Sequence, residues 1–183
     1  MAEPTTGLIR TVRIIDRFTD VSGLLVAWLN VPLVIAVSYE VFARYLFNAP
    51  TMWSFDVAYM LYGTIFMLGA AYALLKGAHI RTDFFFERWS IRTKGLIDSI
   101  SYLVFFFPSI FVFFIVSWNE GWYSFQIGET SEQSAWRPIL WPFRASVPLA
   151  ALLFMVQGVS ESLKCWYQIR YGREFQHREK LEV

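Results

Sequence analysis

Few residues of this sequence are placed to bind a ligand or catalyse a reaction, and they lie at the edges of long apolar runs. Glu40 and Arg44 lie four residues apart with the acid first, which favours an ion pair on one face of a helix. His79 and Asp83 are also four apart, which allows a local hydrogen bond. A metal site needs more ligands than this second pair offers. We therefore expect these residues to anchor helices at the membrane interface or to hold a partner subunit.

The sequence lacks the motifs of common enzymes and cofactor proteins. A haem anchor places histidines inside its membrane helices, but His79 and His177 are the only histidines and lie outside the apolar runs. Cys165 is the only cysteine, so no intramolecular disulfide can form. No P-loop, dinucleotide fingerprint, serine-hydrolase elbow or zinc-protease motif occurs. A net charge of +1 gives no basic footprint for nucleic acid. We predict neither an enzyme nor a protein with a cofactor.

The elements that must position these residues are four runs without charged residues, in a chain that is 56% hydrophobic. They are Val21–Tyr39, Val57–Leu75, Ser99–Asn119 and Ala145–Ser160. The first would rise about 28 Å as a helix, close to the thickness of the bilayer hydrocarbon. The sequence therefore predicts an all-α membrane protein with four transmembrane helices, forming a single domain over residues 1–183.

The basic residues predict the orientation of these helices. Thirteen of the sixteen Lys and Arg residues lie in the N-terminal segment, the loop between spans two and three, and the C-terminal segment. Basic segments stay in the cytoplasm. Both termini should therefore be cytoplasmic, with residues 1–19 as an amphipathic segment and 170–183 as a tail.

Two segments are predicted to contact the cytoplasmic lipid surface. Residues 7–19 read as an amphipathic helix with Leu8, Val12 and Ile15 on one face and Arg10, Arg13 and Arg17 on the other. Such a helix can lie on anionic lipid with its apolar side submerged; the alternative is a simple cytoplasmic extension of the first span. The basic segment Lys76–Lys94 also carries several aromatic residues, which suits an interfacial segment.

Span two and the loop before it contain further candidates for structural roles. Pro50 belongs to a turn, and Trp53 and Asp56 open the span. An acid in the first helical turn complements the positive end of the helix dipole. A stripe of small residues follows at four-residue intervals: Gly69, Ala73 and Gly77. Such a stripe lets another helix approach closely, and that helix belongs either to this chain or to a partner.

The loop between spans three and four is acidic and polar, and Glu129, Glu132 and Trp136 make it a candidate docking surface for a soluble partner. The alternative is an ordinary solvated loop. The middle of each span lacks Asp, Glu, Lys and Arg, whereas transporters with their own site place polar groups near the midplane. This pattern favours a scaffold over a complete transporter.

Three stretches of the sequence resemble the small membrane subunit of TRAP (tripartite ATP-independent periplasmic) transporters, the DctQ family. The first is Glu40-Val-Phe-Ala-Arg44-Tyr-Leu-Phe-Asn48-Ala-Pro50-x-x-Trp53-x-x-Asp56. The second is Gly77-Ala-His79-Ile-Arg81-Thr-Asp83, after Gly69-Ala70. The third is Gly128-Glu-Thr-Ser-Glu-x-Ser134-Ala-Trp136-Arg-Pro138, with Trp141-Pro142.

The resemblance implies a tripartite system in a bacterial inner membrane. A periplasmic binding protein would deliver an organic acid to this subunit and a large DctM-type permease subunit. Uptake would be driven by sodium, which is expected to bind in the large subunit. The matching residues Glu40, Arg44, Pro50, Trp53, Asp56, His79 and Asp83 would position helices and contact that subunit. The alternative is a membrane anchor of a respiratory electron-transfer complex.

Overall fold

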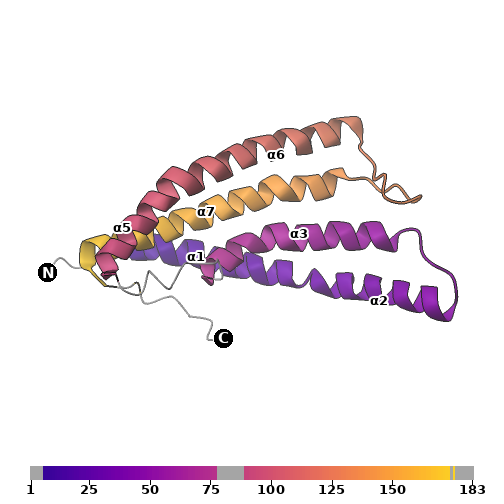
Figure 1. Ribbon diagram of the computed structural model, residues 1–183, viewed down its shortest axis with the longest axis horizontal. Helices are drawn as coiled ribbons and strands as arrows, with labels where there is room; N and C mark the ends of the chain where they lie inside the picture. Colours follow the sequence, from indigo (N-terminus) through magenta and orange to yellow (C-terminus); the bar gives the residue numbers. More distant parts are fainter. Residues whose placement is uncertain (1–5, 78–88, 174, 176–183) are drawn as a thin grey trace. The chain divides into compact units, whose positions relative to one another are not determined.

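A computed structural model describes residues 6–77, 89–173 and 175, and these residues form helices joined by loops (Figure 1). The elements are α1 (Thr6–Ala27), α2 (Asn30–Leu46), α3 (Ser54–Leu75), α5 (Ile91–Ser101), a π-helical turn (Tyr102–Phe106), α6 (Phe107–Ile127) and α7 (Trp141–Tyr171). Within these described ranges, β pairing is limited to an isolated bridge between Thr130 and Ile139.

Four helical segments are long and apolar enough to cross a membrane, which confirms the predicted all-α fold with four spans. They are Gly7–Leu46, Ser54–Leu75, Ile91–Ile127 and Trp141–Tyr171. Each is longer than its apolar run, because helical residues also extend into the flanking sequence. The cytoplasmic location of both termini stays a prediction.

The chain divides into two compact units. Unit 1 comprises Met1–Ser22, Ala70–Val112 and Leu152–Val183, and unit 2 comprises Gly23–Gly69 and Phe113–Ala151. The prediction of one four-span domain is not tested by this division, since all four long helical segments contribute residues to both units.

The distribution of side chains is that of a protein in lipid. Many large apolar side chains are exposed, among them Leu25 at 66% and Phe105 at 69%. The largest fully buried side chains are mostly polar, such as Gln157 and Asp56. In lipid, apolar side chains gain nothing by leaving the surface, so helices associate through small residues and internal hydrogen bonds.

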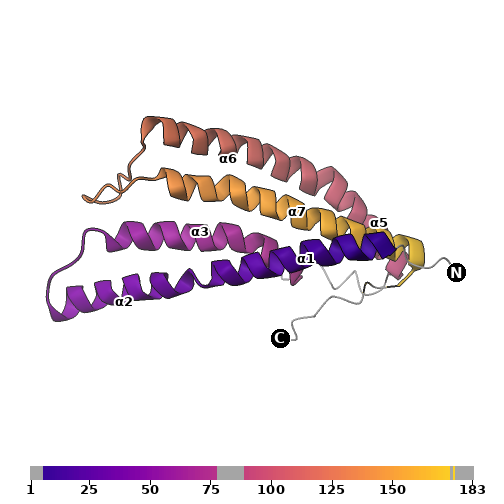
Figure 2. The ribbon, with the colours of Figure 1, turned by 180° about the vertical axis from the view of Figure 1, so that it is seen from behind.

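The predicted first span is broken between α1 and α2 (Figure 2). Pro32 has no N–H to donate to the Trp28 carbonyl, which instead accepts from the Val31 amide at 3.1 Å. The Asn30 side chain donates to the Ala27 carbonyl at 2.9 Å. The freed carbonyls are thus bonded locally, as a proline in a membrane helix requires.

The predicted amphipathic segment is helical, and it is continuous with the start of the apolar run in α1. Val12, which was expected to face lipid, is 0% exposed, and Asp16 and Thr19 on the same side are also buried. This side of the segment therefore packs against protein, as the alternative of an extended first span expects.

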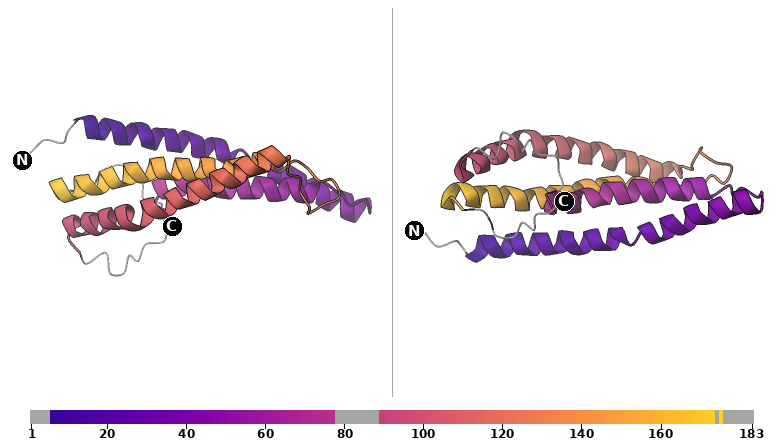
Figure 3. Two further views of the ribbon diagram at one scale, coloured as in Figure 1. Left: turned by 90° about the horizontal axis from the view of Figure 1, so that it is seen from above. Right: turned by 60° about the horizontal axis from the view of Figure 1, so that its bottom comes forward.

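Two irregular features shape the ends of the other helices. A π-helical turn joins α5 to α6 directly before Pro108, so that α5, the turn and α6 form one continuous helical segment (Figure 3). A π turn suits this place because the proline ring crowds the carbonyl four residues earlier. After α3, Gly77 adopts φ +71° and its amide bonds the Leu74 carbonyl at 3.1 Å, which ends the helix.

Candidate functional site

Many polar side chains of the described residues gather in three clusters, each within one compact unit. The loop-one cluster is built on Glu40, Arg44 and Thr51. The loop-three cluster comprises Asp56, Ser131 and Ser134, with Arg144, Glu129 and Glu120. The α1–α7 network comprises Asp16, Thr19, Gln157, Ser160, Glu161 and Lys164.

The loop-one cluster confirms the predicted pair of Glu40 and Arg44 and adds a third member. The Arg44 guanidinium donates to one Glu40 oxygen from Nε at 2.9 Å and from Nη2 at 2.5 Å. The other Glu40 oxygen accepts from the Thr51 amide at 3.0 Å and from the Thr51 hydroxyl. The carboxylate therefore ties the end of α2 to the residues that lead into α3.

The residues around this carboxylate complete the connection between the two helices. Asn48 lies in a turn with φ 50°, and the Ala49 amide caps α2 by bonding the Ala43 carbonyl at 3.0 Å. The exposed Pro50 follows, and Trp53 stacks on Tyr39 with ring centroids 5.7 Å apart. The predicted residues Pro50 and Trp53 thus lie beside Glu40 in the structure.

Asp56 has a larger structural role than that of a helix-dipole partner. It lies in the first turn of α3 and is 0% exposed. Its carboxylate accepts from the Ser131 hydroxyl at 2.5 Å and from the Ser134 hydroxyl. A charged acceptor makes these hydrogen bonds stronger than neutral ones, so Asp56 holds the loop between α6 and α7 against the start of α3.

Arg144 at the start of α7 holds the same loop from another side. It bonds Glu129 at 2.6 Å and reaches Glu120 on α6 at 3.5 Å. Backbone bonds close the loop, from the Ser131 amide to the Pro138 carbonyl at 2.8 Å and from the Leu140 amide to the Glu129 carbonyl at 2.9 Å. These bonds therefore connect the loop to α6 and α7.

The candidate docking residues of this loop differ in the solvent exposure of their side chains. The Glu129 carboxylate is bonded to Arg144, and its side chain is 25% exposed. Glu132 is exposed, and Trp136 is 50% exposed. Of the three predicted contact residues, Glu132 and Trp136 are therefore exposed, whereas Glu129 is bonded within the loop region.

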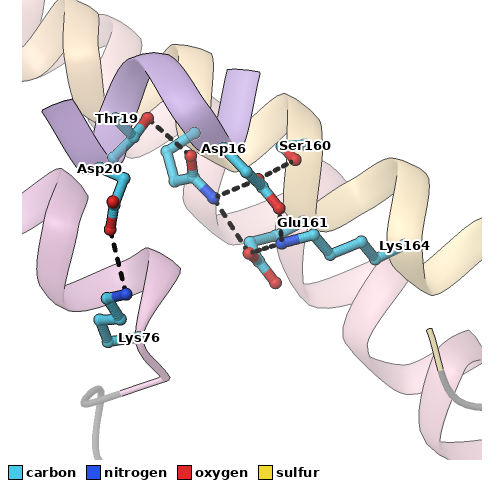
Figure 4. A network of polar contacts seen from close by, with 8 residues as sticks. Asp16, Thr19, Asp20, Lys76, Ser160, Glu161 and Lys164 are labelled. Atoms are coloured by element: carbon cyan, nitrogen blue, oxygen red, sulfur yellow. Dashed lines mark hydrogen bonds and ion pairs between the residues drawn. The ribbon is translucent and has the colours of Figure 1, made fainter. Parts of the chain in front are cut away.

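The α1–α7 network buries three charged side chains in unit 1 (Figure 4). The Lys164 ammonium lies 2.9 Å from Asp16 and 2.7 Å from Glu161. Side-chain exposure is 9% for both Lys164 and Asp16 and 5% for Glu161. Buried charges persist only when they are paired and hydrogen-bonded, so the ammonium between the two carboxylates is central to the network.

Uncharged groups complete the network. The Gln157 amide nitrogen donates to Asp16 at 3.2 Å and to Glu161 at 3.1 Å, and its carbonyl accepts from the Thr19 hydroxyl at 2.8 Å. The Ser160 hydroxyl donates to Asp16 at 2.6 Å. Asp16 thus bonds three side chains of α7, which fixes the register of α1 on that helix.

Two helix glycines outside the predicted small-residue stripe lie at close contacts within the chain. A Cβ on Gly95 would lie 2.9 Å from the Cys165 carbonyl, and one on Gly158 would collide with the Phe106 ring. Gly69 and Gly77 have no atom within 4 Å of such a Cβ. The half-buried Ala73 lies between them. No described side chain therefore occupies the space beside Gly69 and Gly77.

Some predicted residues lie outside the described part of the chain. They are His79 and Asp83, with most of the basic segment Lys76–Lys94. Among the residues that the structure does describe, no group of three or more His, Cys, Asp or Glu side chains is placed to hold a metal ion.

The comparison with protein families decides which class of membrane protein this is. Residues 33–167 match the model of the family described as "Tripartite ATP-independent periplasmic transporters, DctQ component". The chain belongs to the DctQ family. The match includes the loop-one and loop-three clusters and the α7 part of the α1–α7 network. No curated protein and no solved structure matched the chain.

Sequence reasoning missed most of the residues that this DctQ chain uses to hold its helices together. Gln157, Ser160, Glu161 and Lys164 follow the spacing of one helix face, which was a readable signal of a polar stripe. The charge pattern predicts a cytoplasmic segment around Asp16, with no contact to another helix. The partners of Asp56 lie 75 and 78 residues away along the chain, and no local sequence pattern predicts them.

Proposed function

We propose that this chain is the small, non-catalytic scaffold subunit of a TRAP transporter in a bacterial inner membrane. Its task is to brace a large DctM-type permease subunit while that subunit moves its substrate. The observation that carries this proposal is the DctQ match over residues 33–167. The exposed apolar side chains on α2 and α6, such as Phe42 at 59% and Val112 at 60%, offer surfaces for lipid and for another membrane protein.

The transport reaction itself is assigned to the partners. A periplasmic binding protein delivers an organic acid, and the large subunit moves it inward with sodium ions bound in that subunit. The internal bonding of Glu40, Asp56, Arg144 and Lys164 supports this division of work. These charged groups hold helices and loops of the DctQ chain together, which is what a rigid support requires.

The loop between α6 and α7 is the proposed contact for the binding protein. Asp56 and Arg144 hold it in one conformation, and a preformed surface loses little conformational entropy on binding. Glu132 and Trp136 are its exposed members among the predicted contacts. An aromatic anchor beside a charged residue is typical of interface hot spots.

The alternative of a respiratory membrane anchor is not favoured, because the matched family is a transporter component. That alternative predicts a haem absorbance band in the purified protein. The proposed role predicts a colourless protein that binds a permease.

Co-purification tests the proposed role. The full chain carries an affinity tag and is co-expressed with the large permease subunit encoded beside it. We expect the two proteins to elute together after detergent extraction and size-exclusion chromatography, in a fixed ratio. Separate elution in several mild detergents and in nanodiscs would contradict the scaffold role.

A further inference from the structure

The outward face of α1 carries three arginines that no other described side chain engages. Arg10, Arg13 and Arg17 are exposed. At about 100° per residue they fall within roughly 60° of one another around the helix. In the part of the chain that the structure describes, no acidic side chain lies within ion-pair distance of any of them. The nearby Asp20 is bonded to Lys76 at 3.0 Å.

The opposite side of the same helix is committed to protein contacts. Val12, Asp16 and Thr19 are 0%, 7% and 2% exposed, and Asp16 and Thr19 bond side chains of α7. These contacts fix the rotation of α1, so the three arginines must face away from α7. An amphipathic helix lying with Val12 in lipid would require the reverse rotation.

The outward face changes from basic to apolar along the helix. Arg10, Arg17 and Val21 are spaced by seven and four residues, about two turns and one turn, and so lie along nearly one line. Val21 is 51% exposed, and the nearby Phe18 is 55% exposed. A line of guanidinium groups that gives way to exposed apolar side chains matches the boundary between lipid headgroups and acyl chains.

We propose that Arg10, Arg13 and Arg17 form a binding face for the headgroups of anionic phospholipids, with Phe18 and Val21 in contact with the acyl chains. Guanidinium groups bind phosphate oxygens through paired hydrogen bonds. The apolar stretch requires a ligand with a hydrocarbon tail, which identifies a membrane lipid and not a free phosphate. This proposal concerns only the contact of the chain with lipid, so a negative result for lipid binding would not contradict the proposed transporter role.

The test is native mass spectrometry of the full chain, purified in mild detergent and incubated with equal amounts of phosphatidylglycerol and phosphatidylcholine. We expect the wild-type chain to retain phosphatidylglycerol preferentially. Each arginine near an anionic lipid surface is worth roughly fivefold in affinity. The R10Q/R13Q/R17Q variant should therefore retain at least about tenfold less phosphatidylglycerol, with no change for phosphatidylcholine.

Two further variants separate this face from general charge and from misfolding. R92Q/R170Q/R173Q removes the same number of positive charges, one each from α5, from α7 and from the residues just after α7. This variant should retain phosphatidylglycerol almost as the wild type does. R10K/R13K/R17K keeps the charges and should restore most of the binding. The proposal is overturned if the wild-type chain shows no preference for phosphatidylglycerol, or if the R10Q/R13Q/R17Q variant retains as much of it as the wild type. It is also overturned if the two glutamine variants lose equal amounts of phosphatidylglycerol. A lysine variant that retains no more of this lipid than R10Q/R13Q/R17Q does would overturn it as well.

Discussion

At the scale of single residues, Lys164 is the group on which the α1–α7 network depends. Lys164→Met would leave the Asp16 and Glu161 carboxylates buried without the ammonium that they share. Removing one partner of a buried ion pair costs about 3–5 kcal/mol. We expect a clear loss of thermal stability, measured by tryptophan fluorescence during heating in detergent.

A neutral version of the same network provides the control. The D16N/E161Q/K164M triple variant leaves no buried charge in this network and should recover most of the stability that Lys164→Met loses. A single Lys164→Met variant as stable as the wild type would show that the network does not hold α1 to α7.

Asp56 offers a second test at this scale. Asp56→Ala removes the acceptor for the hydroxyls of Ser131 and Ser134, and each bond to a charged group contributes about 1.5–3 kcal/mol. We expect faster amide hydrogen exchange in the loop over residues 129–138, by tenfold or more. Thr130→Ala, which changes an exposed residue of the same loop, serves as the matched control and should exchange as the wild type does.

The sequence revealed local residue pairs better than distant ones. The pair of Glu40 and Arg44 follows from helix geometry, because residues four apart share a face. Thr51 joins it from across a turn, and the partners of Asp56 come from a loop in the other half of the sequence. Such contacts depend on how helices are arranged in space, which no short spacing encodes.

At the scale of elements, the glycines at helix crossings can be ranked by what a methyl group would meet. Gly95→Ala places a Cβ 2.9 Å from the Cys165 carbonyl, which is backbone and cannot move aside. We expect a destabilisation of about 1–3 kcal/mol, with a smaller loss for Gly158→Ala because the Phe106 ring can shift. Gly69→Ala meets no atom within 4 Å and should gain about 0.5–1 kcal/mol in helix stability.

Thermal denaturation of the three variants in one detergent tests this order of stabilities. A Gly95→Ala variant more stable than Gly69→Ala would contradict it.

The four spans were predictable because length and lack of charge are physical requirements of the bilayer. The break after Ala27 was not predicted, because a proline in a membrane helix is often tolerated without interruption. Here Pro32 lies close to Asn30, whose side chain caps the Ala27 carbonyl at 2.9 Å. The combination of a missing donor and a competing side chain ended the helix.

At the scale of the whole molecule, the surface beside Gly69 is a candidate for contact with the large subunit. Gly69→Leu should leave the stability of the isolated chain nearly unchanged, because no described atom occupies that space. It should lower the yield of the co-purified complex by several fold if the large subunit packs there. Ala27→Leu, which enlarges a small exposed residue of α1, is the control, and equal yields for the two variants would argue against this surface.

Family membership rests on the match over residues 33–167, and several residues of the three resembling stretches bond within the chain. The loop-one and loop-three clusters lie within the matched residues 33–167. Their bonds shape the ends of the helices, where the sequence had suggested positioning roles. The α1 contribution to the α1–α7 network precedes the match, so neither the family pattern nor the charge pattern revealed it.

The most direct test of the scaffold role is solute uptake by purified components in proteoliposomes. An inward sodium gradient is applied to vesicles that contain the large subunit alone, this chain alone, or both, with the binding protein and its organic acid outside. We predict sodium-dependent uptake only when both membrane subunits are present. Uptake by vesicles that contain this chain alone, or full activity of the large subunit without it, would contradict the scaffold role.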